Sequence, residues 1–315
     1  MELEEFVKLM KQNETQGNTD NISPENPAPV NYAYLANKKL VEETTVPTLY
    51  ISLTDTKTSI FESKIGGTPY LPRDMEIPKD KNGKQMKLLA QFDCTEFSEL
   101  EDYPHTGMLQ FWLTTDYSWS DYKVIYHENI DMTLTEDEVL TRIDEFIDGT
   151  DGGFPVNGEY GVTFTFGSES MSIDDERVKA LFCQYYTEIS GEYISEPEYA
   201  GNGDYGSEVY DVFEECSDHS GFGSKIGGYR SIAQLPDYLT YRPKEYRTGS
   251  EQQWYGYTEE IDMKSDDCDL LLFQLYSNSS GKVMWGDFGA AQFHIKRRDL
   301  KNRNFNAVYY HWDCS

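Results

Sequence analysis

Basic residues are scarce in this sequence. Its 315 residues include 27 Lys and Arg against 56 Asp and Glu, which gives a formal net charge of −29 at pH 7. A field of this sign repels the phosphates of nucleic acids and the head groups of anionic lipids. We therefore expect neither nucleic acid nor a membrane as partner, and a basic protein as the kind of macromolecule this chain would attract.

Cysteine is also sparse, and the five cysteines never form a CxxC pair. That absence argues against a zinc knuckle or a redox dithiol, and we expect no metal and no cofactor. No apolar run approaches the roughly 18 residues of a membrane helix. The first residues lack the basic segment and apolar core of a secretory signal. The expectation is a cytoplasmic, reduced protein.

Familiar catalytic motifs are missing as well. The sequence has no G-x-S-x-G nucleophile elbow, no Walker A loop and no G-x-G-x-x-G dinucleotide fingerprint. The five histidines are scattered along the chain. The sequence therefore leaves open whether the protein is an enzyme.

Aromatic residues, by contrast, are plentiful at 14%, with 24 tyrosines. Tyrosine favours half-buried strands and contact surfaces. Strand patterns occur at 48–55, 87–93, 107–116, 122–129, 160–167, 269–277, 283–295 and 307–314, and helical patterns at 2–11, 134–148 and 174–189, with a helical turn at 298–305.

One pattern occurs twice. SKIGG stands at Ser63–Gly67 and again at Ser224–Gly228. Each copy is followed by LLxQ and then by GxxQF, with nearly equal spacing between the two glutamines. A repeat of this kind predicts an internally duplicated β unit.

These patterns predict an α+β fold built from internally duplicated, mainly antiparallel β-sheet units with peripheral helices. Residues 1–31 are expected to form an N-terminal helix and linker. Residues 32–315 are expected to form a single domain, with a β repeat at 46–132, an acidic helical insert at 133–221 and a second β repeat at 222–315.

SKIGG followed by PYLP, the LLLFQL strand, MWGDFGAAQF and the terminal WDC together resemble the YwqG-like family of bacterial proteins, a domain of unknown function. The resemblance covers the chain from about residue 30 to the end. In the second copy Tyr229-Arg230 stands where the first has Thr68-Pro69, so PYLP is not repeated. The resemblance implies an α+β fold with a duplication and an immunity role against a secreted toxin, and it supplies no catalytic residues.

The SKIGG copies have two interpretations. Paired glycines after an apolar residue are typical of a structural turn at a strand end. Alternatively, the backbone amides of Gly66, Gly67, Gly227 and Gly228 form an anion cradle that Lys64 and Lys225 complete.

MWGDFG, at residues 284–289, is the most specific local motif that suggests a ligand site. Trp285 and Asp287 flank a glycine, a pairing suited to a ligand ring or a cation. The alternative is a tight hairpin in which Trp285 covers the core and Asp287 binds the turn amides. If these residues meet Lys64 and Lys225 between the two β repeats, they form the site of a small-molecule-binding protein or a metal-dependent enzyme.

In the acidic centre of the chain, tyrosines stand among carboxylates, a composition that is found in protein interfaces. The main functional hypothesis is an intracellular binding protein that neutralises a basic toxin through this surface. The alternative is a solvated acidic face. The candidate partner-binding residues are Tyr193, Glu196, Glu198, Tyr199, Asp204, Tyr205 and Glu208.

Overall fold

The structure is a computed structural model of the whole chain. It describes residues 30–116, 118–143, 153–171, 175, 177–194, 222–231, 262–266 and 268–314. The expected N-terminal helix at 2–11 and most of the linker to residue 31 lie outside these ranges.

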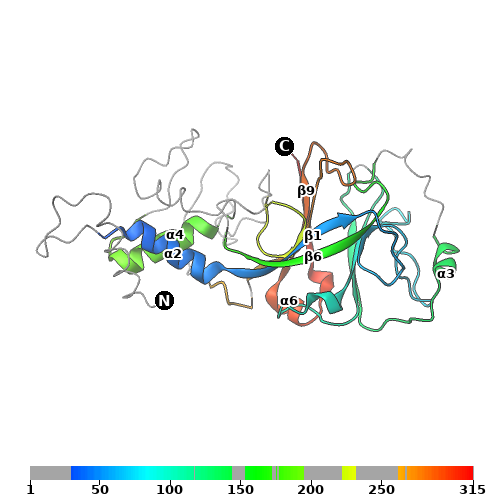
Figure 1. Cartoon of the computed structure of the whole chain (residues 1–315), viewed down its shortest axis with the longest axis horizontal. Helices are drawn as coiled ribbons and strands as arrows, with labels where there is room; N and C mark the ends of the chain where they lie inside the picture. The colour runs from blue at the N-terminus through cyan, green and yellow to red at the C-terminus, as the bar shows by residue number, and fades with distance from the viewer. Residues whose placement is uncertain are drawn as a thin grey trace, which may run out of the picture.

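A single curved sheet forms the body of the molecule (Figure 1). Its ten strands are ordered β10-β9-β8-β7-β1-β6-β2-β3-β4-β5, and every pair of neighbours is antiparallel. The strands are β1 (Val46–Thr54), β2 (Lys64–Gly66), β3 (Lys87–Asp93), β4 (Met108–Leu113), β5 (Tyr122–His127), β6 (Glu159–Glu169), β7 (Lys225–Gly227), β8 (Asp269–Tyr276), β9 (Ala290–Lys296) and β10 (Tyr309–Asp313).

The two edge strands of this sheet approach one another. The Tyr122 hydroxyl on β5 donates to the Val308 carbonyl at 2.8 Å, just before β10. The Tyr122 and Tyr310 rings also pack, with centroids 5.0 Å apart. The sheet is therefore nearly closed into a barrel, which covers edges that would otherwise be open to other chains.

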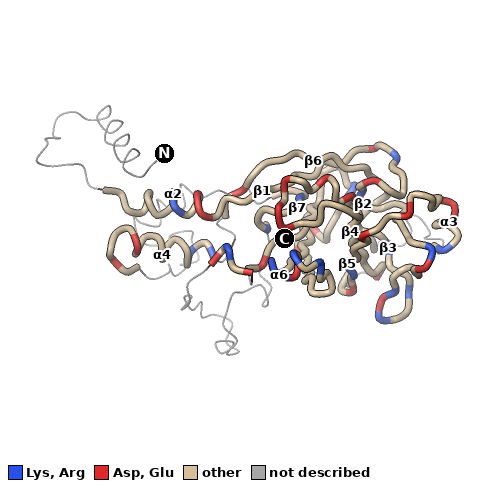
Figure 2. The backbone as a smooth tube through the Cα atoms, turned by 90° about the horizontal axis from the view of Figure 1, so that it is seen from below, with Lys and Arg blue, Asp and Glu red and all other residues tan. Residues whose placement is uncertain are grey.

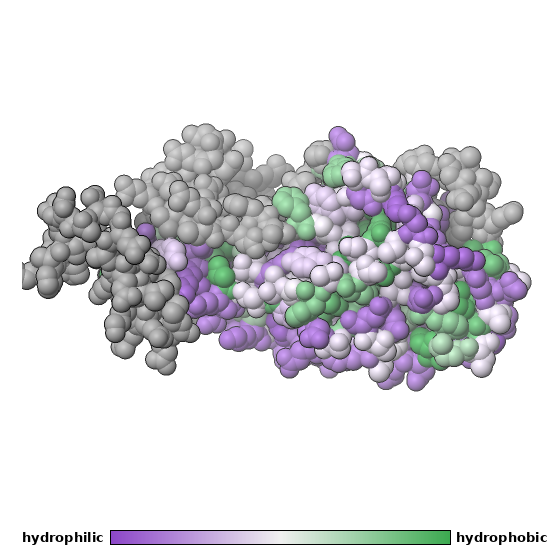
Figure 3. Space-filling model, viewed as in Figure 1, coloured by the Kyte–Doolittle hydropathy of each residue, from purple (hydrophilic) through white to green (hydrophobic). Residues whose placement is uncertain are grey.

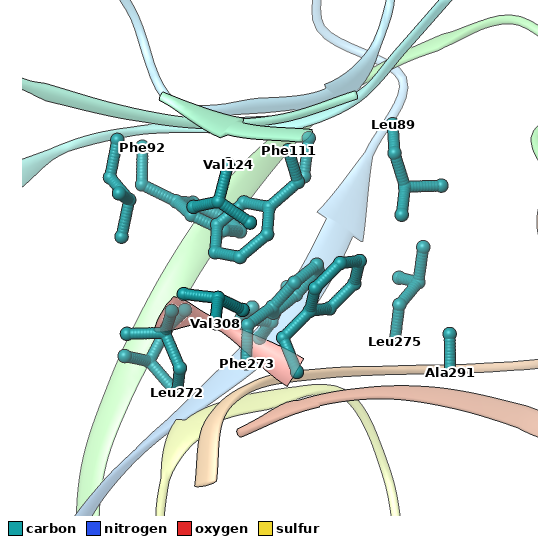
Figure 4. Packing of buried hydrophobic residues seen from close by; sticks show 14 of the residues in the cluster. Leu89, Phe92, Phe111, Val124, Leu272, Phe273, Leu275, Ala291 and Val308 are labelled. Carbon is teal, nitrogen blue, oxygen red and sulfur yellow. The ribbon is translucent and has the colours of Figure 1, made fainter. Parts of the chain in front are cut away.

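The barrel interior is aromatic. Phe92 and Phe111 from the first half of the sheet meet Phe273 and Phe293 from the second, with ring centroids 4.8–5.9 Å apart. Figure 4 shows Leu89, Phe111 and Val124 facing Phe273, Leu275 and Ala291 across this core. One core thus joins strands that are far apart in sequence.

The two halves of the sheet share their strand pairing. In each, a short KIG strand pairs with a strand carrying LLxQ, and that strand pairs with the one carrying xxQF. Gln91 lies opposite Gln110, and Gln274 lies opposite Gln292. A β-bulge follows Leu88 in one half and Leu271 in the other.

Two helices form an arm at one end of the molecule, where long β1 and β6 emerge from the barrel (Figure 1). These are α2 (Tyr32–Thr44) and α4 (Arg177–Ser190), which pack side by side. α4 confirms the expected helix at 174–189. The sequence interpretation missed α2, whose buried face carries one large apolar side chain, Leu40, beside Ala33, Ala36, Asn37 and Thr44 and so gives little helical contrast.

Two shorter helices lie on the barrel. α3 (Glu136–Leu140) begins with the expected Thr135–Glu138 capping box and lies at the opposite end from the arm. It is shorter than the expected helix at 134–148, and residues 144–148 of that range lie outside the described residues. α6 (Arg297–Lys301) confirms the expected helical turn near the C-terminus.

The described chain thus confirms a mainly antiparallel sheet with peripheral helices. Figure 2 shows acidic and basic residues interspersed along it, with a basic group at α6. On the face in Figure 3, hydrophobic residues form small patches among hydrophilic ones. Among the described helices, none combines the length and the apolar character needed to cross a bilayer.

Candidate functional site

A pocket of about 170 Å³ opens where the second SKIGG turn, strands β8 and β9 and the start of α4 meet. Its polar lining is unusual for so acidic a protein because it holds three arginines and a histidine. The charged and titratable lining residues are Glu101, Asp102, Tyr103, Asp175, Arg177, Tyr229, Arg230, Asp269, His294 and Arg297.

The innermost element is an ion pair between Asp175 and Arg177. The Arg177 Nε and Nη2 groups donate to the two Asp175 carboxylate oxygens at 2.8 and 2.7 Å, a bidentate geometry. Both side chains are buried. Burial favours the neutral acid, but Arg177, helped by Arg230, lowers the pKa of Asp175 below its usual range. The pair therefore stays ionised.

His294 on β9 lines the same pocket and is buried. Burial, and then the charges of Arg230 and Arg177, hold the pKa of His294 well below its ordinary value. The imidazole is therefore neutral at pH 7. Within the described chain its Nε2 atom has no hydrogen-bond partner. A buried polar atom in this state leaves a bonding position to fill.

Two further arginines complete the cationic side. Arg297, at the start of α6, forms an ion pair with Asp102 and donates from Nη2 to the Met263 carbonyl at 3.1 Å. Arg230 follows the second SKIGG turn and is buried. Its positive charge contributes to lowering the pKa of both Asp175 and His294. The pocket thus surrounds a neutral imidazole with three arginines, two of which are paired with the lining carboxylates Asp175 and Asp102.

The remaining wall is apolar, with Val46, Pro47, Leu100, Leu270 and Met263 among its residues. Tyr103 stands in this wall, and its hydroxyl is already engaged with the Leu271 carbonyl at 2.7 Å. A concave apolar wall with a few converging polar groups is the usual form of a small-molecule site. The pocket suits a small molecule with one polar and one apolar end.

The SKIGG lysines are buried and paired within the protein. Lys225 donates to both carboxylate oxygens of Glu169, at 2.8 and 2.7 Å. Lys64 donates to the Thr68 carbonyl at 3.1 Å and lies 3.6 Å from Glu159. Burial lowers the pKa of Lys64, and Glu159 opposes that effect. Both ammonium groups therefore have partners without any ligand.

The two SKIGG turns do not meet in one cleft. Strands β1 and β6 lie between β2 and β7 in the sheet. The four glycines all have positive φ, from 70 to 77°, as a strand-end turn requires. Gly227 and Gly228 line the pocket described above. Gly66 and Gly67 approach Gly158 and Glu159 instead.

Trp285 lies elsewhere, in the barrel core. Its side chain is fully buried and packs edge-on against Trp119, with centroids 5.4 Å apart. Its backbone amide donates to the Ser277 hydroxyl at 2.8 Å. Asp287, two residues on, is exposed. Neither residue lines the pocket that contains Arg177, Arg230 and Arg297, which we call the arginine pocket.

Of the candidate partner-binding residues, only Tyr193 lies among those described, just beyond the end of α4, where it is 82% exposed. Glu196, Glu198, Tyr199, Asp204, Tyr205 and Glu208 lie outside the described residues. Across the ranges that the structure covers, no group of three or more His, Cys, Asp or Glu side chains is arranged to hold a metal ion.

Sequence reasoning missed the residues that build the pocket. Asp175, Arg177, Arg230, His294 and Arg297 come from three separate stretches of chain and match no spaced motif. One available signal was charge, because HIKRR at 294–298 is a basic cluster in a very acidic chain. Another was Arg230, which breaks the match between the two SKIGG copies.

A search of curated proteins found no match to this chain. A family model does match it, over residues 63–314, or about four fifths of the sequence. That model is described as a domain of unknown function, DUF1963. The match spans both SKIGG turns and every pocket residue except Val46 and Pro47. The chain therefore belongs to the DUF1963 family.

Proposed function

We propose that this protein binds a small organic anion, such as a carboxylic acid, in the arginine pocket. The observation that carries the proposal is His294, a buried neutral imidazole with an open Nε2 position among buried arginines. A carboxylate oxygen accepting from Nε2–H would satisfy that position and be stabilised by the neighbouring guanidinium charges. The apolar wall would hold the rest of the molecule.

The overall charge of −29 does not rule out an anionic ligand. At physiological ionic strength surface charges are screened beyond about 8 Å, whereas charges in a buried site interact at close range in a medium of lower dielectric. The acidic surface lowers the association rate of an anion, whereas the contacts inside the pocket set its affinity. A volume of about 170 Å³ has room for a molecule about the size of benzene or succinate.

The test is thermal stabilisation of the full chain by acetate, succinate and inorganic phosphate at constant ionic strength. A ligand that binds only the folded state raises the midpoint of unfolding. Arg230→Gln is expected to remove the rise. Lys282→Gln removes the same charge from a residue outside this pocket and is expected to retain the rise. If Arg230→Gln and wild type respond equally, the arginine pocket is not the binding site.

A second candidate function is neutralisation of a basic protein, such as a toxin, in the cytoplasm. The acidic composition supports it, as does Tyr193, which stands exposed beside the acidic centre of the chain. Reversing the charges of Glu196, Glu198, Asp204 and Glu208 should then abolish capture of a basic protein at low salt. Equal capture by wild type and this variant would remove the acidic surface from the mechanism.

We also propose that the two halves of the sheet arose by duplication of one β unit. Matched strand pairing, matched bulges and matched glutamine pairs support this origin. SKIGG followed by PYLP, the LLLFQL strand, MWGDFGAAQF and the terminal WDC support membership of the YwqG-like bacterial proteins.

A further inference from the structure

We infer that residue 294 determines whether the pocket admits a ligand. His294 leaves the pocket open and donates from Nε2–H to a carboxylate of the ligand. In the other half of the sheet, a tryptophan fills the matching position. This inference rests on the proposed function and assigns the ligand specificity of the pocket to one residue.

The register makes Trp112 the counterpart of His294. Trp112 on β4 pairs with Leu88, and His294 on β9 pairs with Leu271. In each hairpin the next position along the other strand is the bulge, and the glutamine pair follows it. The two side chains therefore occupy matching positions beside matching bulges, on the outer face of the barrel.

In the first half this position is sealed. Trp112 is fully buried in an apolar cluster with Tyr70, Leu71 and Leu88. Its indole Nε1 donates to the Gln110 Oε1 atom at 3.1 Å, and the His127 Nε2 also contacts that oxygen, at 2.9 Å. The polar atoms around Trp112 are thus satisfied within the protein.

In the second half the same position is open. Arg230 stands where the first half has Pro69, and Ser231 stands where it has Tyr70, as aligned SKIGG copies show. The glutamine framework is retained, since Ser231 N–H donates to Gln274 Oε1 at 3.0 Å and Gln292 Nε2 donates to the Ser231 carbonyl at 2.8 Å. The corresponding bonds, at 2.9 and 2.7 Å, hold Tyr70 in the first half. The scaffold is kept while the apolar or aromatic residues Pro69, Tyr70 and Trp112 are replaced by the polar residues Arg230, Ser231 and His294.

The two halves also differ in whether the buried polar atoms at these positions have hydrogen-bond partners. Gln292 Oε1 and His294 Nε2 both lack a hydrogen-bond partner within the described residues, although both are buried. Of the two side chains, His294 is the one that lines the pocket. His294 lines a cavity bordered by arginines, and with its proton on Nε2 this buried ring nitrogen would donate to an acceptor group, which a carboxylate supplies.

The experiment is a set of three substitutions at position 294 in the full chain, with acetate, succinate and inorganic phosphate as probes and binding measured by titration calorimetry. His294→Gln keeps an N–H donor at a similar reach and is expected to retain binding within about tenfold. His294→Leu keeps space but removes the donor, and His294→Trp fills the space. Both are expected to weaken binding by more than about tenfold. Circular dichroism and the unfolding midpoint establish that each variant is folded.

The outcomes separate the two proposals. Wild type that binds none of the probes overturns the proposed function, and this inference with it. Wild type that binds while His294→Trp binds equally well overturns this inference alone. Binding retained by His294→Leu shows that the donor is not used and contradicts the assigned hydrogen bond. If His294→Trp does not fold, His294→Phe takes its place, since it removes the donor and fills the position with a smaller ring; binding equal to that of wild type in this variant overturns the inference.

Discussion

At the scale of single residues, the two SKIGG lysines differ in how completely each is enclosed. Lys225 and its partner Glu169 are both almost fully buried, whereas Glu159, the partner of Lys64, remains 22% exposed. Removing one member of a buried pair leaves an uncompensated charge, but a partly exposed carboxylate recovers solvation from water. The two sites therefore make a matched comparison.

Lys225→Met is expected to lower the free energy of unfolding by about 3–5 kcal/mol, because Glu169 is left buried and unneutralised. Lys64→Met is expected to cost less, roughly 1–3 kcal/mol. Urea unfolding of both variants measures the difference. Equal costs, or a larger cost at Lys64, would contradict the view that solvent access to the partner sets the penalty.

His127 supplies a prediction about pH. Burial lowers its pKa to about 4 from an ordinary value of 6.5. Between these values the unfolded chain binds a proton that the folded chain does not, so stability falls as pH drops from 6.5 towards 4 and this contribution levels off below. We expect His127→Gln to reduce that fall by about 2–3 kcal/mol.

The measurement is the free energy of unfolding of wild type and His127→Gln at pH 7 and pH 4.5. The same substitution at His105 serves as a control for losing an imidazole. His294 acts in the same direction because its pKa is also lowered by burial, so acid sensitivity remains partly in either single variant. Parallel pH profiles for wild type and His127→Gln would refute this assignment.

At the scale of elements, the glycines of the two SKIGG turns differ in how much room each position leaves for a side chain. Gly66 and Gly227 have φ values of +70 and +72°. A Cβ atom at Gly66 would lie 2.3 Å from the Gly158 carbonyl oxygen, whereas at Gly227 the nearest atom, the Pro47 carbonyl oxygen, would lie 3.0 Å away. The backbone strain is the same at both positions, and the steric clash is not.

Gly227→Ala is therefore expected to cost roughly 1–2 kcal/mol, the price of a left-handed conformation for alanine. Gly66→Ala should cost more, by about 1 kcal/mol or above, because two backbone segments must also move apart. Thermal unfolding of both variants tests this order. A larger loss at Gly227 would show that the turn after β7 is the more tightly packed one.

Elements were also the level at which the sequence was most informative. Alternating or continuous apolar runs identified β1, β3, β4, β5, β6, β8, β9 and β10, because strands buried on one or both faces leave such patterns. The KIG strands were interpreted as turns, since three residues carry no periodicity. The arginine pocket was not predicted because its residues come from the start of α4, the second SKIGG turn, β8 and β9, segments that the fold brings together and that share no spaced motif.

At the scale of the whole molecule, the halves of the sheet are interlocked. β1 precedes the first KIG strand in the chain but pairs with β7, the second one. β6 precedes the second KIG strand but pairs with β2, the first. β1 and β6 then pair with each other along nine register positions from Val46 to Thr54. Neither half completes its sheet without a strand of the other.

This arrangement predicts that the two halves of the sheet unfold together. Tryptophans of both halves report on the process, Trp112 from β4 and Trp285 from the loop before β9, and far-ultraviolet circular dichroism reports on the sheet as a whole. We expect the fluorescence and dichroism transitions in urea to coincide. Two separated transitions would contradict the interlocked description.

The central claim is that the arginine pocket binds a small organic anion through His294. The most direct measurement is a crystal structure of the protein soaked with the probe anion that stabilises it most, compared with the same crystals without it. The account predicts a carboxylate or phosphate oxygen within hydrogen-bond distance of His294 Nε2, with Arg230 beside it. Stabilisation by an anion that binds elsewhere, with nothing new beside His294, would contradict it.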